Sequence, residues 1–331
     1  MNNRISILGD GGWGTALAIL LSKKDYPVTL WSAFSDYASH LQTKRINTRF
    51  LPGIKIPGCV RISDNLKEAI TDKEIVVFAI PSLYLRQVLK KIKRCGYNRS
   101  ISYLSVVKGI ETGSLKRISE IIHEEMGNIK LAVLSGPTIA HEVAKGVPTT
   151  AVIASKDAAL RKYLQDIFMA ELFRVYTNSD VTGVELGGSL KNVIAIACGI
   201  SDGLGFGTNT KAALLSRGLS EISRLGHAMG AKAKTFSGIS GLGDLVTTCI
   251  SPYSRNRFVG EQIGKGRNLK KIKSGMQMVA EGITTAKSAY CLSLKYGIDM
   301  PICKEVYYVI YKNKSPKQAV KDLMTREKKE E

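Results

Sequence analysis

The sequence has few of the residues that bind transition metals. Only four of its 331 residues are histidine, and its cysteines form no CxxC pair. There are six of them: Cys59, Cys95, Cys198, Cys249, Cys291 and Cys303. Zinc sites usually combine closely spaced Cys and His ligands. We therefore expect no metal site, and we expect reduced thiols that are mostly buried.

Long apolar runs and an N-terminal targeting segment are also missing. No apolar run approaches the roughly 18 residues that a membrane span needs, and the first residues read as a strand and a glycine turn instead of a signal peptide. A chain of 331 residues with 44% hydrophobic content is able to bury a large core. We expect a soluble, cytoplasmic protein with two domains.

The sequence has few acidic residues. It contains 28 Asp and Glu against 48 Lys and Arg, which gives a formal net charge of +20. Such a balance is common in nucleic-acid-binding proteins. The basic residues are spread along the chain, however, and no aromatic-rich strand pattern of an RNA-binding domain accompanies them. We expect the charge to favour solubility and to attract anionic substrates, and we expect no nucleic-acid partner.

A glycine turn near the N-terminus indicates a ligand. An apolar run leads directly into Gly9-Asp-Gly-Gly-Trp-Gly14 and then into a helix-like segment. In a GxGxxG turn between strand and helix, Gly9 makes the tight turn, Gly11 lets the backbone approach a pyrophosphate, and Gly14 permits close helix packing. The free amides of the helix N-terminus bind the phosphates. Because Pro27–Trp31 completes a βαβ unit, the motif predicts a dinucleotide site.

The end of this second strand lacks the residue that usually selects the cofactor. In NAD-preferring members of the fold an Asp or Glu there holds the ribose hydroxyls. Here the chain continues Trp31-Ser32-Ala33 and has no acid before Asp36. No arginine for a 2′-phosphate stands there either, since Arg45 and Arg49 lie on a later segment. The pattern favours NADP or the use of both cofactors.

Strand and helix patterns alternate through the first half of the chain. The apolar runs end at small or helix-breaking residues: Pro81-Ser82, Lys108-Gly109 and Ser135-Gly-Pro137. Ligands of doubly wound sheets lie at the carboxyl ends of the strands, so these turns should line a cofactor crevice. From about Val181 onward, helical patterns joined by glycine-rich loops replace the alternation. We predict a Rossmann-type, doubly wound α/β domain in residues 1–180 and an all-helical domain in residues 181–331.

Lys191 lies in an apolar, helix-compatible run from Val184 to Ile200. At helical spacing one face beside it carries only small residues, which leaves room for something to dock, and a separate face is apolar. A partly desolvated ammonium in such a slot could bind an anion or exchange a proton with a carbonyl or hydroxyl. The alternative is a lysine at a helix edge whose head reaches water.

Two further segments of the helical half suit a binding site. Ser254 is a plausible helix N-cap, which would place Arg255 and Asn256 in a first turn whose amides and guanidinium suit a phosphate monoester. An ordinary capped helix with exposed arginines is the alternative. Asp244 stands among glycines and could be a turn residue, yet a carboxylate near Lys191 would fix the orientation of the lysine.

Several long motifs in order resemble the NAD(P)-dependent glycerol-3-phosphate dehydrogenase family over nearly the whole chain. The motifs are Gly9–Ala18, Asn47-Thr-Arg-Phe-Leu-Pro-Gly53, Pro81-Ser82, Lys108-Gly-Ile-Glu111, Ser135-Gly-Pro-Thr138 with Glu142-Val-Ala, Gly183–Ile194, Gly241-Leu-Gly-Asp244 and Ser254-Arg-Asn-Arg257. The resemblance implies a Rossmann domain followed by a helical domain similar to the C-terminal domain of 6-phosphogluconate dehydrogenase. It also implies reversible reduction of dihydroxyacetone phosphate by NAD(P)H to sn-glycerol 3-phosphate for phospholipid synthesis, by a cytoplasmic homodimer.

The resemblance assigns roles position by position. Lys191 matches the family's proton donor and acceptor and also touches the substrate, and Lys108 matches a lysine that touches substrate and cofactor. The other substrate positions are Gly136, Thr138, Asp244, Ser254, Arg255 and Asn256. The cofactor positions are Gly9, Gly11, Gly12, Trp13, Gly14, Ala33, Lys108, Ala140, Arg255, Val279 and Glu281. Trp13 could instead simply pack, and Glu281 could be a helix cap.

Two positions depart from the family pattern. Thr138 replaces a serine often found there and keeps the hydroxyl, whereas Ala33 stands where many members carry an Arg or His that favours NADPH.

Two other functions stay open. A related dehydrogenase of the same two-domain plan could act on a hydroxy acid. A nucleotide-sensing protein without turnover, touching nucleic acid through its basic surface, is the third hypothesis.

Overall fold

A computed structural model describes residues 3–276, 278–328 and 330, and it divides into two compact units. The first unit comprises the chain up to Lys108 together with Lys116–Glu185. The second comprises Gly109–Leu115 and the chain from Leu186 onward. The domain boundary between residues 180 and 181 stays a prediction: the units divide inside one helix, and the short segment Gly109–Leu115 belongs with the helices.

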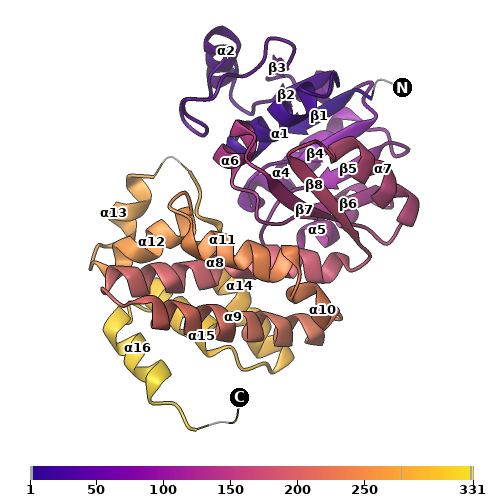
Figure 1. Cartoon of the computed structure of the whole chain (residues 1–331). Helices are drawn as coiled ribbons and strands as arrows, with labels where there is room; N and C mark the ends of the chain where they lie inside the picture. The colour runs from indigo at the N-terminus through magenta and orange to yellow at the C-terminus, as the bar shows by residue number, and fades with distance from the viewer. Residues whose placement is uncertain (1–2, 277, 329, 331) are drawn as a thin grey trace. The chain divides into compact units, whose positions relative to one another are not determined.

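The first unit is built on an eight-stranded sheet in the order β3-β2-β1-β4-β5-β6-β7-β8 (Figure 1). Every neighbouring pair is parallel except β6 and β7. The strands are β1 (Ile5–Leu8), β2 (Val28–Trp31), β3 (Arg61–Ser63), β4 (Ile75–Phe78), β5 (Ser102–Ser105), β6 (Lys130–Ser135), β7 (Thr149–Ala154) and β8 (Phe173–Asn178). The helices are α1 (Gly12–Ser22), α2 (Ser35–Lys44), α3 (Leu66–Ile70), α4 (Ser82–Cys95), α5 (Ile118–Met126), α6 (Ala140–Lys145) and α7 (Ala158–Phe168).

The central strands are buried on both faces because their side chains alternate between two cores. Ile5 and Ile7 of β1 point into one core, and Leu8 points into the other. Val77 and Phe78 of β4 divide in the same way. The strand order reverses at β1, between β2 and β4, which is the point where doubly wound sheets bind dinucleotides. The predicted Rossmann-type unit is confirmed.

The second unit is entirely helical within the part of the chain that the structure describes. Its elements are α8 (Val181–Gly203, which begins in the first unit), α9 (Thr208–Ala228), α10 (Ala233–Phe236), the π-helical turn η1 (Ile239–Gly243), α11 (Asp244–Ile250), α12 (Arg255–Gly264), α13 (Leu269–Ser274), α14 (Glu281–Tyr296), α15 (Pro301–Tyr311) and α16 (Pro316–Met324). One apolar core joins them, with side chains from α8 at its centre. The predicted all-helical fold of this part is confirmed.

No uninterrupted apolar run was expected to approach the length of a membrane span, but the helix α8, which contains charged residues, is long and apolar enough for one by length and composition. This helix has 23 residues, and its most apolar stretch is buried inside the protein. A helix that is apolar all round suits the centre of a helical core as well as a bilayer, and here neighbouring helices cover it.

Two helices of the second unit pack backbone against backbone through glycines. A Cβ at Gly199 of α8 would lie 2.0 Å from the carbonyl oxygen of Arg257 on α12. A Cβ at Gly260 of α12 would lie 2.1 Å from the carbonyl oxygen of Ile196 on α8. Real side chains do not tolerate such distances, so glycine on both helices lets them approach. The first turn of α12 is thereby held close to the middle of α8.

The cysteines are all free, but the expectation that they are mostly buried holds for only half of them. Cys198, Cys249 and Cys303 are buried, Cys95 and Cys291 are half-buried, and Cys59 is exposed. Among the residues that the structure describes, no three His, Cys, Asp or Glu side chains gather as metal ligands.

A buried carboxylate ties two helices of the second unit together. Glu221 on α9 is 1% exposed and accepts hydrogen bonds from the backbone amides of Ile302 (2.7 Å) and Cys303 (3.1 Å). These amides belong to the first turn of α15, where amides have no partner inside the helix. Burial raises the pKa of Glu221 to about 7, against an ordinary value of 4.5.

This shift predicts how stability changes with pH. Because the folded-state pKa of Glu221 is raised, the folded protein binds more protons than the unfolded chain between pH 4.5 and 7. The contribution of this group to stability therefore falls as pH rises through that window, by about 3 kcal/mol in total. In urea unfolding, Glu221→Gln should lose this part of the pH dependence. An identical dependence in wild type and variant would contradict the assignment.

Candidate active site

The glycine turn forms the cradle that the sequence predicts. Gly9 follows β1 with a φ of +120°, and a Cβ there would lie 2.6 Å from the carbonyl oxygen of Ala79. Gly14 in the first turn of α1 lies against Gly9, whose carbonyl oxygen would be 2.0 Å from an added Cβ. Around Gly11, in contrast, nothing lies within 4 Å of a Cβ position. The open space at the N-terminus of α1 fits a pyrophosphate, so the residues present fit a dinucleotide.

Three neighbouring positions that the sequence predicts for the cofactor also gather at the start of α1. A Cβ at Gly12 would lie 3.6 Å from the Cβ of Ala140, the first residue of α6. Trp13 is half-buried and packs against Phe173, with 6.4 Å between the ring centroids. This contact favours a packing role for the Trp13 side chain, the alternative that the sequence left open. Its assignment to the cofactor stays a prediction.

The carboxyl end of β2 carries a feature that the sequence did not predict. Ala33 and Phe34 are exposed there, and Ser32 is buried. The hydroxyl of Ser32 donates to the carboxylate of Asp10 at 2.7 Å. The strand itself has no acid, as predicted, but a carboxylate from the glycine turn lies beside its end.

Lys108, Gly136 and Thr138 form one hydrogen-bonded set in the first unit. Lys108 follows β5, and its ammonium donates to the carbonyl oxygen of Gly136 at 2.9 Å and to the hydroxyl of Thr138 at 3.5 Å. Gly136 directly follows β6 with a φ of +143°, a conformation that favours glycine. The cation is therefore held at the carboxyl ends of two strands, where the fold binds its ligands.

Lys191 is buried and paired. Its side chain is 6% exposed, so its head does not reach bulk water. The ammonium forms an ion pair with the carboxylate of Asp244, and it donates to the hydroxyl of Thr248 at 2.6 Å. Asp244 begins α11, directly after the π-helical turn η1, and its side chain is 2% exposed. The structure thus brings together two predicted residues that are 53 positions apart.

Thr248 was missed by the sequence analysis. It lies one turn after Asp244 on α11, and its hydroxyl also donates to the carbonyl oxygen of Asp244 at 2.7 Å. The spacing Asp-x-x-x-Thr places both side chains on one face of a helix. This spacing was the signal for Thr248 in the sequence. It can be recognised only when α11 is known to lie against Lys191.

The small face beside Lys191 is filled by protein. A Cβ at Gly187 would lie 2.7 Å from the carbonyl oxygen of Ser240 in η1. Farther along the helix, α12 covers Gly199. The interpretation of this face as free room for docking was therefore wrong. Its small residues instead let α12 and the segment leading to Asp244 approach the lysine.

The start of α12 confirms the predicted cap. The hydroxyl of Ser254 accepts a hydrogen bond from the backbone amide of Arg257 at 3.3 Å. Arg255 is exposed, and its guanidinium donates to the carbonyl oxygen of Val279 at 3.0 Å. The predicted cofactor position Val279 therefore lies beside Arg255, in the segment that leads into α14, and Glu281 is the first residue of that helix.

Asn256 is buried, and its side-chain amide is used inside the protein. Its nitrogen donates to the side-chain oxygen of Asn192 at 2.8 Å, and its own oxygen accepts from the backbone amide of Gly282 at 2.9 Å. These bonds connect α8, α12 and α14 at one point. They support a role for Asn256 in orienting the first turn of α12, in addition to the phosphate contact that the family resemblance assigns to it.

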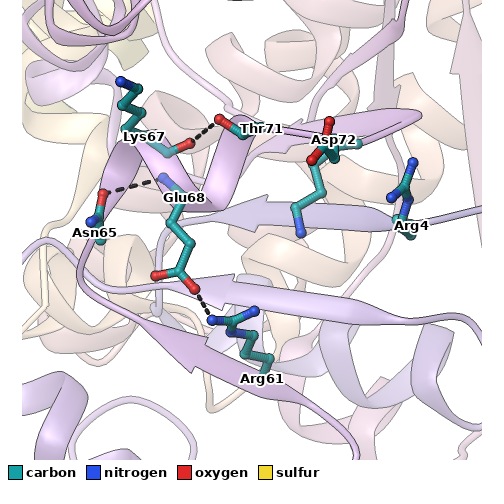
Figure 2. Close-up of a pocket in the computed structure, with 8 residues that line it drawn as sticks. Arg4, Arg61, Asn65, Lys67, Glu68, Thr71 and Asp72 are labelled. Carbon is teal, nitrogen blue, oxygen red and sulfur yellow. Dashed lines mark hydrogen bonds and ion pairs between the residues drawn. The ribbon is translucent and has the colours of Figure 1, made fainter.

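A separate pocket of about 510 Å³ lies at the opposite end of the strands (Figure 2). Arg4 precedes β1, Arg61 begins β3, and α3 supplies much of the remaining lining. Glu68 pairs with Arg61, and Glu74 pairs with Arg4 at 2.9 Å. None of the predicted site residues lines this pocket.

Comparison with known proteins places the chain among dehydrogenases. Two family models match: the N-terminus of NAD-dependent glycerol-3-phosphate dehydrogenase over residues 4–161, and the C-terminus over residues 180–321. A glycerol-3-phosphate dehydrogenase [NAD(P)+] from Prosthecochloris aestuarii is 47% identical over 99% of both chains. A protein of the same name from Fusobacterium nucleatum is 48% identical over 98% of both chains.

Solved structures give the same result. A glycerol-3-phosphate dehydrogenase from Coxiella burnetii matches with a TM-score of 0.95 and 37% identity, covering 98% of this chain and 99% of the other. The yeast enzyme of that name matches with a TM-score of 0.82 and 28% identity, covering 98% of this chain and all of the other.

Proposed function

Since this chain belongs to the NAD-dependent glycerol-3-phosphate dehydrogenase family, we propose that Lys191 is the proton donor and acceptor of its reaction. The enzyme is an NAD(P)-dependent oxidoreductase that reduces dihydroxyacetone phosphate to glycerol 3-phosphate. The observation that carries the role of Lys191 is its burial together with Asp244 and Thr248, in the unit that also contains the capped helix of Arg255.

The chemistry requires an acid at the substrate oxygen. When a nicotinamide cofactor is bound, it supplies a hydride to C2 of the ketone. Negative charge then develops on the C2 oxygen, and an ammonium within hydrogen-bond reach can stabilise this charge and protonate it. In the reverse direction the neutral amine of Lys191 takes the proton from the C2 hydroxyl.

Asp244 and Thr248 hold Lys191 in place for this transfer. Each accepts a hydrogen bond from the ammonium. A lysine side chain has several rotatable bonds, and fixing it reduces the entropy that is lost when the transition state forms.

The first turn of α12 is the proposed phosphate site. The helix N-terminus contributes backbone amides and the positive end of the helix dipole, and Arg255 adds a guanidinium fork. Lys108, hydrogen-bonded to Gly136 and Thr138, is proposed to contact both substrate and cofactor. The dinucleotide itself would be held at Gly9, Gly11, Gly12 and Gly14, with Trp13, Ala33 and Ala140 beside them. The family resemblance also assigns Val279 and Glu281 to the cofactor.

Arg255→Ala should raise the KM for dihydroxyacetone phosphate by roughly 10- to 100-fold, because a charge-assisted contact to the phosphate is lost. The phosphate is bound equally in ground and transition states, so kcat should change little. Arg267→Ala, which removes the same charge just beyond the other end of α12, is the matched control and should leave KM unchanged. An unchanged KM in Arg255→Ala would place the phosphate elsewhere.

The proposed function is tested by initial rates of NADH and NADPH oxidation with dihydroxyacetone phosphate, with unphosphorylated dihydroxyacetone as the control. A rate that depends on the phosphate supports the assignment of Lys191 and Arg255 to this substrate. Turnover of a hydroxy acid in place of the triose phosphate would favour the related-dehydrogenase hypothesis. Cofactor binding without any turnover would favour the sensing hypothesis.

The cellular role is also part of the proposal. We infer that the product supplies glycerophospholipid synthesis, and that the enzyme works in the cytoplasm as a homodimer without a nucleic-acid partner. The apolar stretch of α8, the helix long enough to span a membrane, is buried inside the protein, which supports a location outside the bilayer. Size-exclusion chromatography with light scattering tests the dimer, and salt-dependent binding to DNA would contradict the absence of a nucleic-acid partner.

A further inference from the structure

The glycine turn carries an acidic residue that no proposed role yet uses. Asp10 stands between Gly9 and Gly11, and its carboxylate accepts the hydroxyl of Ser32 at 2.7 Å. The backbone amide of Gly9 donates to the carbonyl oxygen of Trp31 at 3.0 Å, which fixes the turn against the last residue of β2. The Asp10 carboxylate therefore lies at the carboxyl end of β2.

The turn is held in this position by a second segment. The side-chain amide of Asn47 donates to the carbonyl oxygen of Asp10 and to the hydroxyl of Thr15, both at 2.7 Å. The hydroxyl of Thr15 also donates to the carbonyl oxygen of Asp10 at 3.2 Å. Because the backbone of Asp10 is fixed by these bonds and its side chain by Ser32, the carboxylate is preorganised before any ligand arrives.

This position is where dinucleotide-binding folds place the carboxylate that binds the ribose hydroxyls of NAD. In this chain the strand continues as Ser32 and Ala33, which supply neither an acid nor a base. Phe34, next along the chain, is 67% exposed and offers an aromatic surface on which a purine could stack. The surroundings of Asp10 thus suit the adenosine half of the cofactor.

We propose that Asp10 is the residue that selects the cofactor: it accepts hydrogen bonds from the adenosine ribose hydroxyls of NADH and repels the 2′-phosphate of NADPH. The enzyme then prefers NADH, whereas the missing acid at the end of the second strand favoured NADP or the use of both cofactors. This inference rests on the proposed function for its dinucleotide, and it assigns a specificity residue outside the strand end.

Arg49 provides the opposing chemistry. It lies on the segment that follows Asn47, its charge acts on Asp10, and its guanidinium lies 4.4 Å from the ring centroid of Tyr37. Burial raises the pKa of Asp10, while the Ser32 hydroxyl and the charge of Arg49 oppose that rise. If Arg49 bound the 2′-phosphate, the enzyme would prefer NADPH. Control of the cofactor by Asp10 and control by Arg49 therefore predict opposite preferences.

The test is a fluorescence titration of the full chain with NADH and with NADPH, which requires no substrate. We expect wild type to bind NADH at least about tenfold more tightly than NADPH. Asp10→Asn keeps the size of the side chain and loses the charge, so it should reduce that ratio by about tenfold or more, mainly through tighter NADPH binding. Asp36→Asn removes an exposed carboxylate from the first turn of α2 and should leave the ratio unchanged.

Three results would overturn the inference. The wild type could bind NADPH more tightly than NADH, or Asp10→Asn could weaken the binding of both cofactors equally. The third is a ratio of NADH to NADPH affinity that changes in Arg49→Ala but not in Asp10→Asn. Turnover of dihydroxyacetone phosphate is measured in parallel on the same preparations. If Asp10→Asn changes the affinity ratio but the enzyme does not turn over dihydroxyacetone phosphate, the inference holds and the proposed substrate is wrong. If the enzyme turns over the substrate but the affinity ratio does not respond to Asp10→Asn, only the inference is wrong.

Discussion

Replacing Lys191 with methionine should lower kcat for dihydroxyacetone phosphate reduction by about a thousandfold or more, while the cofactor still binds. Without the ammonium, no group in the Lys191, Asp244 and Thr248 set can protonate the C2 oxygen: a hydroxyl and a carboxylate are all that remain. General acid catalysis contributes about 10²- to 10⁴-fold, and stabilisation of developing charge in a water-poor site contributes a similar factor. Pre-steady-state measurement of cofactor oxidation separates this chemical step from product release.

The variant also leaves the Asp244 carboxylate buried without its cation, which costs about 3–5 kcal/mol in comparable pairs. Lost activity could then reflect unfolding. Lys191→Arg keeps the positive charge and the ion pair, yet a guanidinium does not give up its proton at working pH. It should fold and bind cofactor but remain nearly inactive. Lys287→Met, at an exposed position of α14 in the same unit, controls for loss of a lysine. Substantial activity in Lys191→Arg would remove Lys191 from proton transfer.

The first unit was the more predictable part, because its signals are local in the sequence. The glycine turn works through Gly9, Gly11 and Gly14, which are contiguous with the strand and the helix that they connect. Their functions depend on close backbone approach, and the structure shows that approach between Gly9 and Gly14. The strand ends at Lys108 and Gly136 could be predicted for the same reason, although the hydrogen bond between them could not.

The second unit was less predictable, because its site depends on contacts between distant segments. A charge within an apolar helix identified Lys191, but the residues that hold it come from α11. The small residues beside it suggested an open slot, whereas Gly187, one of them, packs against the backbone of Ser240. Periodicity shows which side chains share a face, and it does not show what covers that face.

The end of β2 illustrates a third limit. After Trp31 the chain has no acidic residue before Asp36. The parallel register of β1 and β2 instead brings the residue after Gly9 to the same place. In a sheet, a functional side chain can come from the turn after the neighbouring strand. The absence of an acid at the end of one strand therefore does not exclude a carboxylate from the site.

Asp244→Asn should lower kcat by about a hundredfold while the affinity for cofactor stays the same. The amide keeps the size of the side chain and one acceptor, but it no longer carries the charge that holds the Lys191 ammonium in one orientation. Loss of an orienting group that acts on a catalytic residue is known to reduce rates strongly even when geometry is retained. Thr248→Val, which removes the uncharged acceptor at 2.6 Å, should have a smaller effect, about tenfold. Steady-state kinetics with circular dichroism on both variants checks these values.

A double variant decides how Asp244 acts. If the aspartate contributes only by positioning Lys191, then once the lysine is methionine there is nothing left to position, and Lys191→Met with Asp244→Asn should be no slower than Lys191→Met alone. The double variant should also be the more stable of the two, because it removes the unpaired buried carboxylate that the single change leaves behind. Rate losses that multiply would show instead that Asp244 contacts the reacting atoms itself, and the proton transfer would then have to be divided between the carboxylate and the ammonium.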